Sequence, residues 1–500
     1  MLFHDIFAHH PKEREAIIDQ DRSVTYGEFQ DLVERWAAYF EALGVKKGDR
    51  VGLVSKNCLE FIVTYFAVIK AGGVIVPINF QLVPREIAYI VKDTAMKLLV
   101  VKEALPRLAE PLQELSAPSL MQITFDELHH APEQEFVPVS LTETDPSTII
   151  YTSGTTGKPK GAMLSHGNLY ANARDFMESI PLTAEDTALC VLPMYHCFAW
   201  TVCVAGPLLC GGRIVIQAVY QFKAAMRLVK QYGVTMFTGV PAVYRLLHES
   251  RDLDSVDSVR YFISGGAPLG LDLARGFALK FGRPVLEGYG LSEASPVVSV
   301  NLPHKVKVGS IGPTIAHVKA KIINAHGEEV PHFERGELLV KGPNVMLGYL
   351  NLPDATAKAI EKDGWLHTGD VGYMDEDGFI FLVDRVKDMI ISSGENVYPR
   401  EIEEVVSAYP GVAECSVIGI PDALRGQAIC LYVVPRERET IDKKALRQYL
   451  IGRIAPYKVP REYFLVESLP KTALGKVRKN VLRDETVAIL SKNKFAGRAL

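Results

Sequence analysis

Blocks of apolar and polar positions predict that helices and strands take turns along most of the chain. Apolar residues at helical spacing alternate with short β-branched runs, which is the rhythm of a parallel sheet covered by helices. In residues 25–79 this pattern predicts an amphipathic helix through Leu32, Trp36 and Phe40, a strand at 50–54, a helix at 59–70 and a strand at 74–77. Further strand-like runs follow at 147–152, 188–192, 213–217, 236–239 and 260–264.

The pattern of predicted elements changes in the second half of the chain. Glycine turns become frequent from about residue 308 to 382, which favours a β-rich subdomain with strands at 319–323 and 337–341. After the charged segment DRVKD, Asp384 to Asp388, mixed signals predict a small unit of its own. Its predicted elements are strands near 389–391, at 413–419 and at 427–434, and helices at 399–409 and 443–451. We therefore predict an N-terminal domain at 1–384, a hinge at 385–388 and a C-terminal domain at 389–500.

Composition narrows the class of protein. The 500 residues exceed what one core usually supports, and 48% hydrophobic residues, 23% charged residues and a net charge of −4 are ordinary for a globular protein. Neither a nucleic-acid partner nor an integral membrane segment is indicated, because the apolar stretch 61–78 is broken by Lys70 and Gly72-Gly73. The start has no secretory signal. An odd number of cysteines, seven, without a CxxC pair indicates reduced thiols in a cytoplasmic protein.

The stretch YTSGTTGKPKGA, Tyr151 to Ala162, reads as a phosphate-binding loop. Glycines let backbone N–H groups approach an anion, hydroxyls donate to its oxygens, and Lys158 and Lys160 add positive charge. No acidic residue lies between Asp145 and Asp175 to oppose that charge. The loop follows a predicted buried strand, and α/β sheets bind ligands at the carboxyl ends of their strands. It is not a Walker A loop, because that pattern needs a glycine at 152 and a hydroxyl residue at 159.

This stretch resembles the phosphate-binding signature of the adenylate-forming superfamily, which includes acyl-CoA synthetases, peptide-synthetase adenylation domains and luciferases. The resemblance runs nearly end to end, with later motifs in the expected order. It implies a large N-terminal domain of two doubly wound α/β subdomains plus a β-rich subdomain, and a small mobile α+β C-terminal domain. It also implies ATP and CoA as substrates with Mg²⁺, small molecules rather than macromolecules as partners, and it leaves a homodimer open.

The resemblance assigns nucleotide contacts to each motif. Tyr289 packs on adenine, Ser292 approaches the α-phosphate, Thr152 and Glu293 belong to the Mg²⁺ site, and one or two carboxylates suit that ion. The resemblance implies that Asp370 of WLHTGD and Arg385 of DRVKD contact the ribose hydroxyls. The complete implied set for ATP or AMP is Thr152, Ser153, Gly154, Thr155, Thr156, Gly157, Lys158, Lys160, Gly266, Ala267, Glu287, Gly288, Tyr289, Gly290, Ser292, Asp370 and Arg385.

Near the C-terminus, PKTALGKVRK places Lys476 in a glycine-containing loop. The resemblance gives this lysine a catalytic role, bridging the attacking carboxylate and the α-phosphate, where an ammonium lowers the repulsion between two anions. The C-terminal domain is expected to rotate about Lys387, withdrawing Lys476 and bringing a loop with Ser393, Gly394 and Glu395 to CoA. A basic solvated tail is the plainer interpretation of this region.

The acid to be activated is predicted to have an uncharged tail beyond its carboxylate. No Asp or Glu occurs from Thr187 to His248, whereas an amino-acid substrate would need an anion for its ammonium group. The walls expected for an alkyl chain include Trp200, Val240, Gly265 and Val297, and His196 takes the gate position, which is counted with the catalytic residues. Most of these side chains could instead be core.

Several motifs, LPMYH, EGYGLSEASPV and SSGENVYPREIEEV, resemble bacterial medium- to long-chain fatty-acid–CoA ligases. The predicted function is therefore ATP-dependent fatty-acid–CoA ligation through an acyl adenylate. The main alternative is an aryl or other small carboxylic acid–CoA ligase. Loading of an acyl carrier protein, luciferase-like oxidation and a nucleotide-binding regulatory protein with a dead site are the others.

Overall fold

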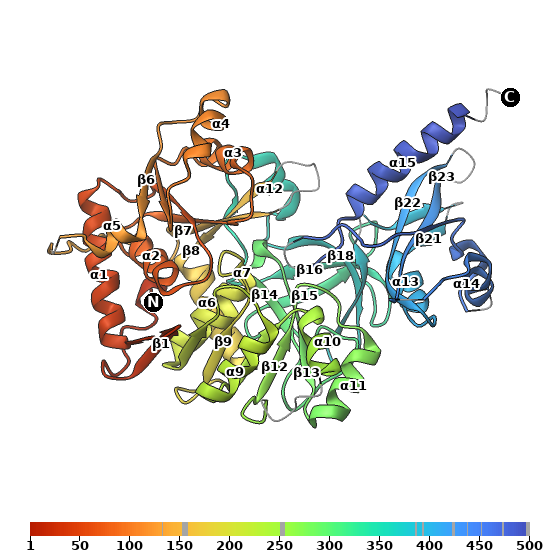
Figure 1. Ribbon diagram of the computed structural model, residues 1–500, viewed down its shortest axis with the longest axis horizontal. Helices are drawn as coiled ribbons and strands as arrows, with labels where there is room; N and C mark the ends of the chain where they lie inside the picture. The colour runs from red at the N-terminus through yellow and green to blue at the C-terminus, as the bar shows by residue number, and fades with distance from the viewer. Residues whose placement is uncertain are drawn as a thin grey trace. The chain divides into compact units, whose positions relative to one another are not determined.

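The computed structural model describes residues 1–132, 134–152, 159–250, 256–385, 388–392, 395–422, 426–437, 439–451, 453–472 and 475–496. The chain folds into two compact units (Figure 1). Unit 1 comprises Met1–Gly265, Leu271–Ala320 and Leu339–His367, and unit 2 comprises Gly266–Gly270, Lys321–Leu338 and Thr368–Leu500.

The larger sheet of unit 1 has eight strands in the order β14-β13-β12-β11-β9-β10-β1-β2. The six strands from β13 to β1 run parallel, and β14 and β2 are antiparallel edges. The strands are β1 (Glu15–Asp19), β2 (Arg22–Thr25), β9 (Thr187–Cys190), β10 (Arg213–Ile216), β11 (Met236–Gly239), β12 (Tyr261–Ser264), β13 (Val285–Gly290) and β14 (Val297–Val300). Their connections include α7 (Cys197–Ala199), the π-helical turn η3 (Trp200–Ala205), α8 (Gly206–Cys210), α9 (Phe222–Tyr232), α10 (Pro241–Glu249) and α11 (Leu271–Phe281).

The second sheet of unit 1 has seven strands in the order β17-β8-β7-β4-β3-β5-β6, of which the five from β7 to β6 run parallel. The strands are β3 (Arg50–Val54), β4 (Val74–Ile78), β5 (Leu98–Val101), β6 (Met121–Thr124), β7 (Pro146–Thr152), β8 (Lys160–Ser165) and β17 (Gly348–Tyr349). The helices of this part are α1 (Tyr26–Ala42), α2 (Leu59–Lys70), α3 (Pro84–Thr94), α4 (Ala109–Glu114), α5 (Phe125–His129), α6 (His166–Ser179) and α12 (Pro353–Ala359).

Local chemistry explains where the helices of unit 1 begin. The Thr25 hydroxyl accepts the Glu28 N–H, and the Glu28 carboxylate accepts the Thr25 N–H, which is a capping box at the start of α1. Ser165 and Asn168 make the equivalent pair at the start of α6. Helix α2 is apolar almost all round because it is buried on nearly every face. No described helix is long and apolar enough to cross a membrane.

Unit 2 is built mainly on β22 and β23, whose alternating residues supply two cores. Val417 and Leu431 belong to the core that also holds residues of α13 and α14, whereas Ile418 and Cys430 belong to the core that holds Leu482 of α15. Its elements are β20 (Ile390–Ser392), β21 (Glu395–Val397), α13 (Pro399–Ser407), β22 (Val412–Asp422), β23 (Gly426–Pro435), α14 (Lys443–Leu450), β24 (Glu462–Leu465) and α15 (Lys479–Ala496). A further sheet has the order β15-β16-β18-β19, with β15 (Lys319–Ile323), β16 (Gly336–Lys341), β18 (Leu366–Met374) and β19 (Ile380–Arg385).

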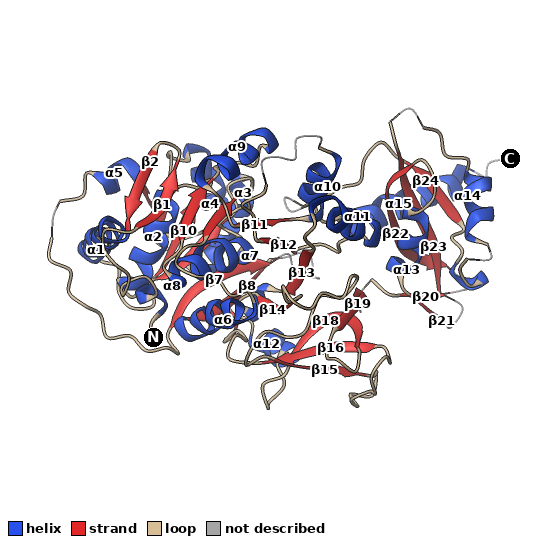
Figure 2. Cartoon of the chain, turned by 90° about the horizontal axis from the view of Figure 1, so that it is seen from below, coloured by secondary structure: helices blue, strands red, loops and turns tan. Residues whose placement is uncertain are grey.

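The predicted α/β class is confirmed, and so are most predicted elements. Helix 59–70 and strand 50–54 have the predicted bounds, and Figure 2 shows strands and helices interleaved through unit 1. The predicted strand 147–152 is confirmed as β7, but the predicted loop is wrong at its other end, because residues 160–162 belong to the antiparallel β8. All seven cysteines are free thiols.

Candidate active site

The predicted phosphate loop closes a β-hairpin at the edge of the parallel part of the seven-stranded sheet. Thr152, near the end of β7, has its Cα partner in Lys160, the first residue of β8. The residues between them that sequence analysis assigned to phosphate, Ser153, Gly154, Thr155, Thr156, Gly157 and Lys158, lie outside the described residues. The hairpin stem therefore places the two ends of the predicted loop side by side.

Tyr349 connects this stem to the predicted magnesium ligand. The Lys160 ammonium lies 5.0 Å from the centre of the Tyr349 ring, and the Tyr349 hydroxyl donates to Glu293 Oε1 at 2.8 Å. The Met346 N–H also donates to the Glu293 carbonyl, at 2.9 Å. Burial, together with the Glu293 carboxylate, raises the pKa of the Tyr349 phenol, which keeps it a donor. No motif in the sequence indicates Tyr349, because residues 293 and 349 lie far apart along the chain.

Tyr289 lies on β13 between two glycines that let β14 approach. A Cβ at Gly290 would lie 2.3 Å from the Pro296 carbonyl oxygen, and one at Gly288 would lie 3.1 Å from that of Ser299. The half-buried Tyr289 has Ser299 as its Cα partner. The strand begins beside β12, where Glu287 is buried and its carbonyl accepts two N–H groups of Asn301. The glycines of GYG are thus needed for strand packing as well as for any nucleotide contact.

His196 caps the short helix α7, and its neighbour contacts the Glu293 segment. His196 Nδ1 accepts the Phe198 N–H at 3.2 Å, so a neutral ring carries its proton on Nε2. Burial lowers the pKa of His196 to about 4, which makes the ring neutral near pH 7. Cys197 Sγ lies 3.2 Å from Ser292 Oγ, and burial raises the pKa of that thiol to about 12. The residue that follows the predicted gate therefore contacts the predicted α-phosphate residue.

Gly265, predicted to line the acyl pocket, lies against the Phe198 ring. A Cβ there would lie 2.9 Å from Cζ of Phe198, so the Phe198 ring already occupies the space over this glycine. Val240, at the start of α10, is half-buried. Val297 is buried, and its N–H donates to Asn172. The remaining predicted wall residue, Trp200, has one ring face stacked on Tyr65 of α2 with 3.7 Å between ring centres.

Unit 2 carries the remaining predicted residues. Asp370 of β18 and Arg385 of β19 are Cα partners in an antiparallel pair, and Asp370 is buried. Lys476 is exposed in a tight loop, where its carbonyl accepts the Thr472 N–H and its N–H donates to the Thr472 hydroxyl. Gly266, with φ +79°, and Ala267 form part of the segment 266–270. The predicted hinge Lys387 and the CoA residues Ser393 and Gly394 lie outside the described residues, and Glu395 is the first residue of β21.

A second group of metal-binding side chains lies elsewhere in unit 1. Asp175, Glu178 and His317 each offer a ligand atom within 4.8 Å of the others. The buried Asp175 carboxylate is, however, already paired with the Arg174 guanidinium at 2.7 Å and with His317 Nδ1 at 3.0 Å. A bound guanidinium disfavours a second cation on the same carboxylate, so we interpret the group as an ion-paired cluster.

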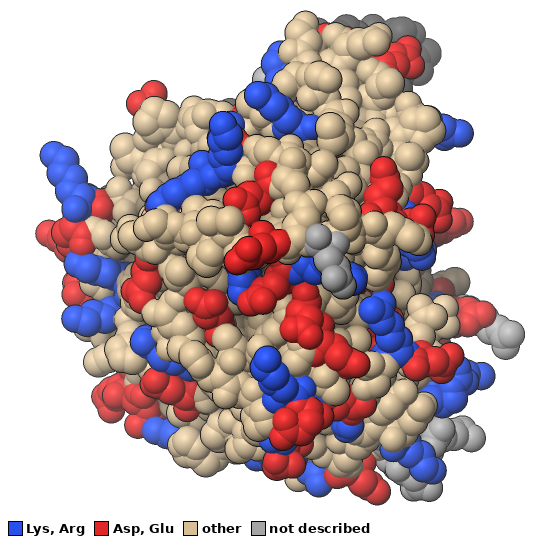
Figure 3. Space-filling view, turned by 90° about the vertical axis from the view of Figure 1, so that its left-hand side faces the viewer, with Lys and Arg blue, Asp and Glu red and all other residues tan. Residues whose placement is uncertain are grey.

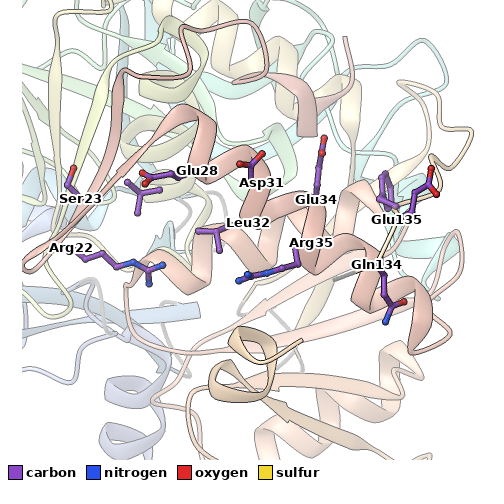
Figure 4. A pocket seen from close by; sticks show the side chains of 11 residues that line it. Arg22, Ser23, Glu28, Asp31, Leu32, Glu34, Arg35, Gln134 and Glu135 are labelled. Atoms are coloured by element: carbon purple, nitrogen blue, oxygen red, sulfur yellow. The ribbon is translucent and has the colours of Figure 1, made fainter. Parts of the chain in front are cut away.

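A pocket of about 750 Å³ also lies apart from the predicted motifs (Figure 4). It is lined from β2, α1 and residues 134–136, at the edge of the eight-stranded sheet opposite β13 and β14. Glu28 and Arg22 on its wall are engaged, in the α1 capping box and in a pair with Glu60 at 3.2 Å. On the face in Figure 3, acidic and basic side chains are mixed rather than gathered by sign. Neither feature indicates a nucleic-acid surface.

Comparison with known proteins identifies the family. Residues 3–350 match the AMP-binding enzyme model, and residues 401–476 match the AMP-binding enzyme C-terminal domain. The chain is 38% identical to a feruloyl-CoA synthase of Amycolatopsis sp over 466 residues, which is 92% of this chain and 94% of the relative. It is 34% identical to a long-chain-fatty-acid–CoA ligase of Salmonella typhimurium over 518 residues, 95% and 92% of the two chains.

Solved structures agree with this match. The ATP-bound structure of MatB from Rhodopseudomonas palustris has a TM-score of 0.91 at 32% identity and covers 97% of this chain and 99% of its own. The o-succinylbenzoate CoA synthetase MenE of Bacillus subtilis, with its acyl-adenylate intermediate, has a TM-score of 0.88 at 30% identity and covers 96% and 97%. The chain belongs to the AMP-binding enzyme family, the adenylate-forming superfamily. Within it, the chain groups with the acyl-CoA ligases.

Proposed function

We propose that this chain activates an uncharged carboxylic acid with ATP and transfers its acyl group to CoA. The acid and ATP would give an acyl adenylate and pyrophosphate, and the CoA thiolate would then attack the acyl carbonyl and release AMP. The observation that carries the proposal is the contact series Lys160, Tyr349 and Glu293, next to Ser292, Cys197 and His196. Tyr349 brings a cation and a carboxylate together, and the neutral His196 ring precedes Cys197, which contacts Ser292 beside that carboxylate.

The chemistry of Glu293 fits magnesium. Tyr349 occupies one side of one carboxylate oxygen, which leaves the other oxygen and further lone pairs for a hydrated ion. Glu293 would hold Mg²⁺ with Thr152 nearby, and the ion would neutralise phosphate charge when bound. The Tyr349 hydroxyl orients the carboxylate, and Lys160, held over the same ring, adds positive charge toward phosphate.

His196 contributes shape and a hydrogen-bond donor, not charge. Its pKa of about 4, caused by burial, leaves it uncharged at neutral pH, with Nε2–H as the donor. Two anions, the carboxylate and the α-phosphate, must meet for adenylation, so the compensating charge has to come from lysines and Mg²⁺. We propose that Lys476 of the exposed unit 2 loop supplies an ammonium for this half-reaction.

The body of the acid is apolar in large part. The fatty acid predicted from sequence is supported by the long-chain ligases at 34% identity, and the aryl alternative by the feruloyl-CoA synthase at 38%. No Asp or Glu occurs from Thr187 to His248, which disfavours an amino acid. The Phe198 ring over Gly265 favours a short or flat acyl body over a long one.

Acid-dependent AMP release, measured with and without CoA, tests the proposal. The expected result is pyrophosphate exchange into ATP with acid alone and steady turnover once CoA is added. A panel of alkanoates from C4 to C16 beside benzoate and cinnamate separates the two substrate classes. Absence of exchange with every acid of the panel would overturn the proposed function.

A further inference from the structure

Two ion pairs hold the ends of the loop that carries Lys476. At the start of this loop, the Lys471 ammonium lies 2.6 Å from Glu414 Oε1 on β22. At its end, the ammonium of Lys479, the first residue of α15, lies 2.9 Å from Glu403 Oε1 on α13. The position of the loop therefore depends on two anchors, both of them on the same part of unit 2.

The two ion pairs differ in their exposure to water. The side chains of Lys471 and Glu414 are 37% and 43% exposed, whereas those of Lys479 and Glu403 are 16% and 21% exposed. Water screens the first pair, which should contribute little, but removing one partner of the second leaves a poorly hydrated charge alone. Although burial opposes its charge, neighbouring carboxylates, Glu403 first among them, raise the pKa of the Lys479 ammonium. The Lys479–Glu403 pair is thus the stronger of the two anchors.

The backbone of β22 fixes the Glu403 carboxylate in its turn. This strand lies at the end of the order β21-β20-β23-β22, so the N–H groups on its outer edge have no strand partner among the described residues. One of them, the Val417 N–H, donates to Glu403 Oε1 at 2.7 Å. The oxygen that holds the Lys479 ammonium is therefore itself held by a backbone donor. Such charge-assisted hydrogen bonds define the geometry of a pair as well as its energy.

Little chain separates this anchor from Lys476. Only Val477 and Arg478 lie between it and the first residue of α15. The Arg478 N–H donates to the Pro470 carbonyl at 2.8 Å, which closes the base of the loop. Helix α15 in turn lies beside β22 (Figures 1 and 2). A shift in the first turn of α15 would therefore move Lys476 as well.

We propose that Glu403, acting through Lys479, is a positioning residue that holds Lys476 where adenylation needs its ammonium. This inference rests on the proposed function, which gives Lys476 its part in the first half-reaction. An ammonium stabilises charge at the reacting phosphate only where it is correctly placed, and a misplacement of about 1 Å can lower a rate by about 100-fold. Thioester formation from the acyl adenylate does not use Lys476, so it should not depend on this anchor.

Glu403→Gln tests the ion pair alone, because the amide oxygen can still accept the Val417 N–H. Acid-dependent pyrophosphate exchange is measured with the acid of the panel on which the native chain has the highest kcat/KM. Glu403→Gln should lower kcat for exchange by about 10- to 100-fold, with KM for ATP and for the acid changed by less than about 3-fold. Thioester formation from the supplied acyl adenylate should stay within about 3-fold of the native rate. Lys479→Met should behave like Glu403→Gln, whereas Lys479→Arg, which keeps the charge, should retain most of the exchange.

The exposed ion pair at the other end of the loop gives a matched control. Glu414→Gln removes a pair of the same kind from the same loop, and it should change exchange by less than about 3-fold. Lys476→Ala gives a second control, because Glu403 is proposed to act only through that lysine. In the Lys476→Ala background, adding Glu403→Gln should lower exchange no further. A merely structural role of Glu403 would instead lower exchange in both backgrounds, and thioester formation with it.

The role of Glu403 would be overturned by a native exchange rate in Glu403→Gln or by equal losses in both half-reactions. It would also be overturned by an equal loss in Glu414→Gln, or by a further loss in the Lys476→Ala background. The thermal unfolding midpoint is measured for every variant, and Lys479→Met carries the same comparison if Glu403→Gln folds poorly. Exchange that survives Lys476→Ala would remove the role of Lys476 and this inference with it. Absence of exchange by the native chain with every acid would instead overturn the proposed function.

Discussion

The contact between Tyr349 and Glu293 gives a sharp test of how the candidate site is organised. Tyr349→Phe removes the hydroxyl that donates to Glu293 Oε1 at 2.8 Å and keeps the ring under the Lys160 ammonium at 5.0 Å. The change therefore isolates the hydrogen bond from the ring contact. Tyr349→Leu removes both.

The magnitude follows from the environment of the pair. A hydrogen bond to a charged group is worth about 1.5–3 kcal/mol, and both residues here are only half-buried, so about 1–2 kcal/mol is expected. If this energy orients Glu293 in the transition state, kcat/KM for adenylation falls by roughly 5- to 30-fold in Tyr349→Phe. The Mg²⁺ concentration for half-maximal rate should rise, because a free carboxylate must be ordered when the ion binds.

Pyrophosphate exchange across a Mg²⁺ titration measures both effects. Tyr26→Phe is the control, since the buried Tyr26 hydroxyl donates to the Gly212 carbonyl at 2.8 Å near the far edge of the eight-stranded sheet. That variant should lose stability without losing kcat/KM at saturating Mg²⁺. Native kinetics in Tyr349→Phe at every Mg²⁺ concentration would refute the orienting role of the hydroxyl.

Three further predictions concern other parts of the molecule. Lys476→Ala should lower adenylation by about 10²- to 10³-fold while thioester formation from a supplied acyl adenylate stays within a few fold; equal losses in both assays would contradict this. Burial lowers the pKa of His4 and of His166 to about 4, so both rings bind protons more weakly in the folded chain than in the unfolded chain. The free energy of unfolding should therefore fall by about 2 kcal/mol for each histidine between pH 7 and pH 5, as measured by urea unfolding. His4→Phe should reduce this fall. Phe198→Ala should clear the space over Gly265 and raise kcat/KM for longer alkanoates relative to short ones; an unchanged chain-length profile would show that this ring does not limit the pocket.

Regular elements were predictable where burial imposes one pattern. Helix 59–70 is apolar on nearly all faces, and strand 74–77 is a short β-branched run between a glycine pair and a polar turn. The strand Lys160–Ser165 was missed because its lysine and glycine carry no β signal. Its pairing with β7 comes from the neighbouring strand, not from its own propensity.

The candidate site also contains residues that the sequence indicates and residues that only the structure reveals. Glu293 and Ser292 stand out in a glycine-rich motif, so the sequence pointed to them. Tyr349 does not, because what distinguishes it is a contact with a residue 56 positions away. That contact is not visible until the strands are in register.

The pairing of β7 with β8 determines where the Lys160 side chain points. Thr152 and Lys160 oppose each other in the ladder, and the Lys160 ammonium lies over the Tyr349 ring. A one-position slide of β8 would turn every side chain of that strand to the other side of its sheet, so Lys160 would leave the Tyr349 ring. A residue inserted or deleted within β8 itself should therefore cost activity even where the strand still forms.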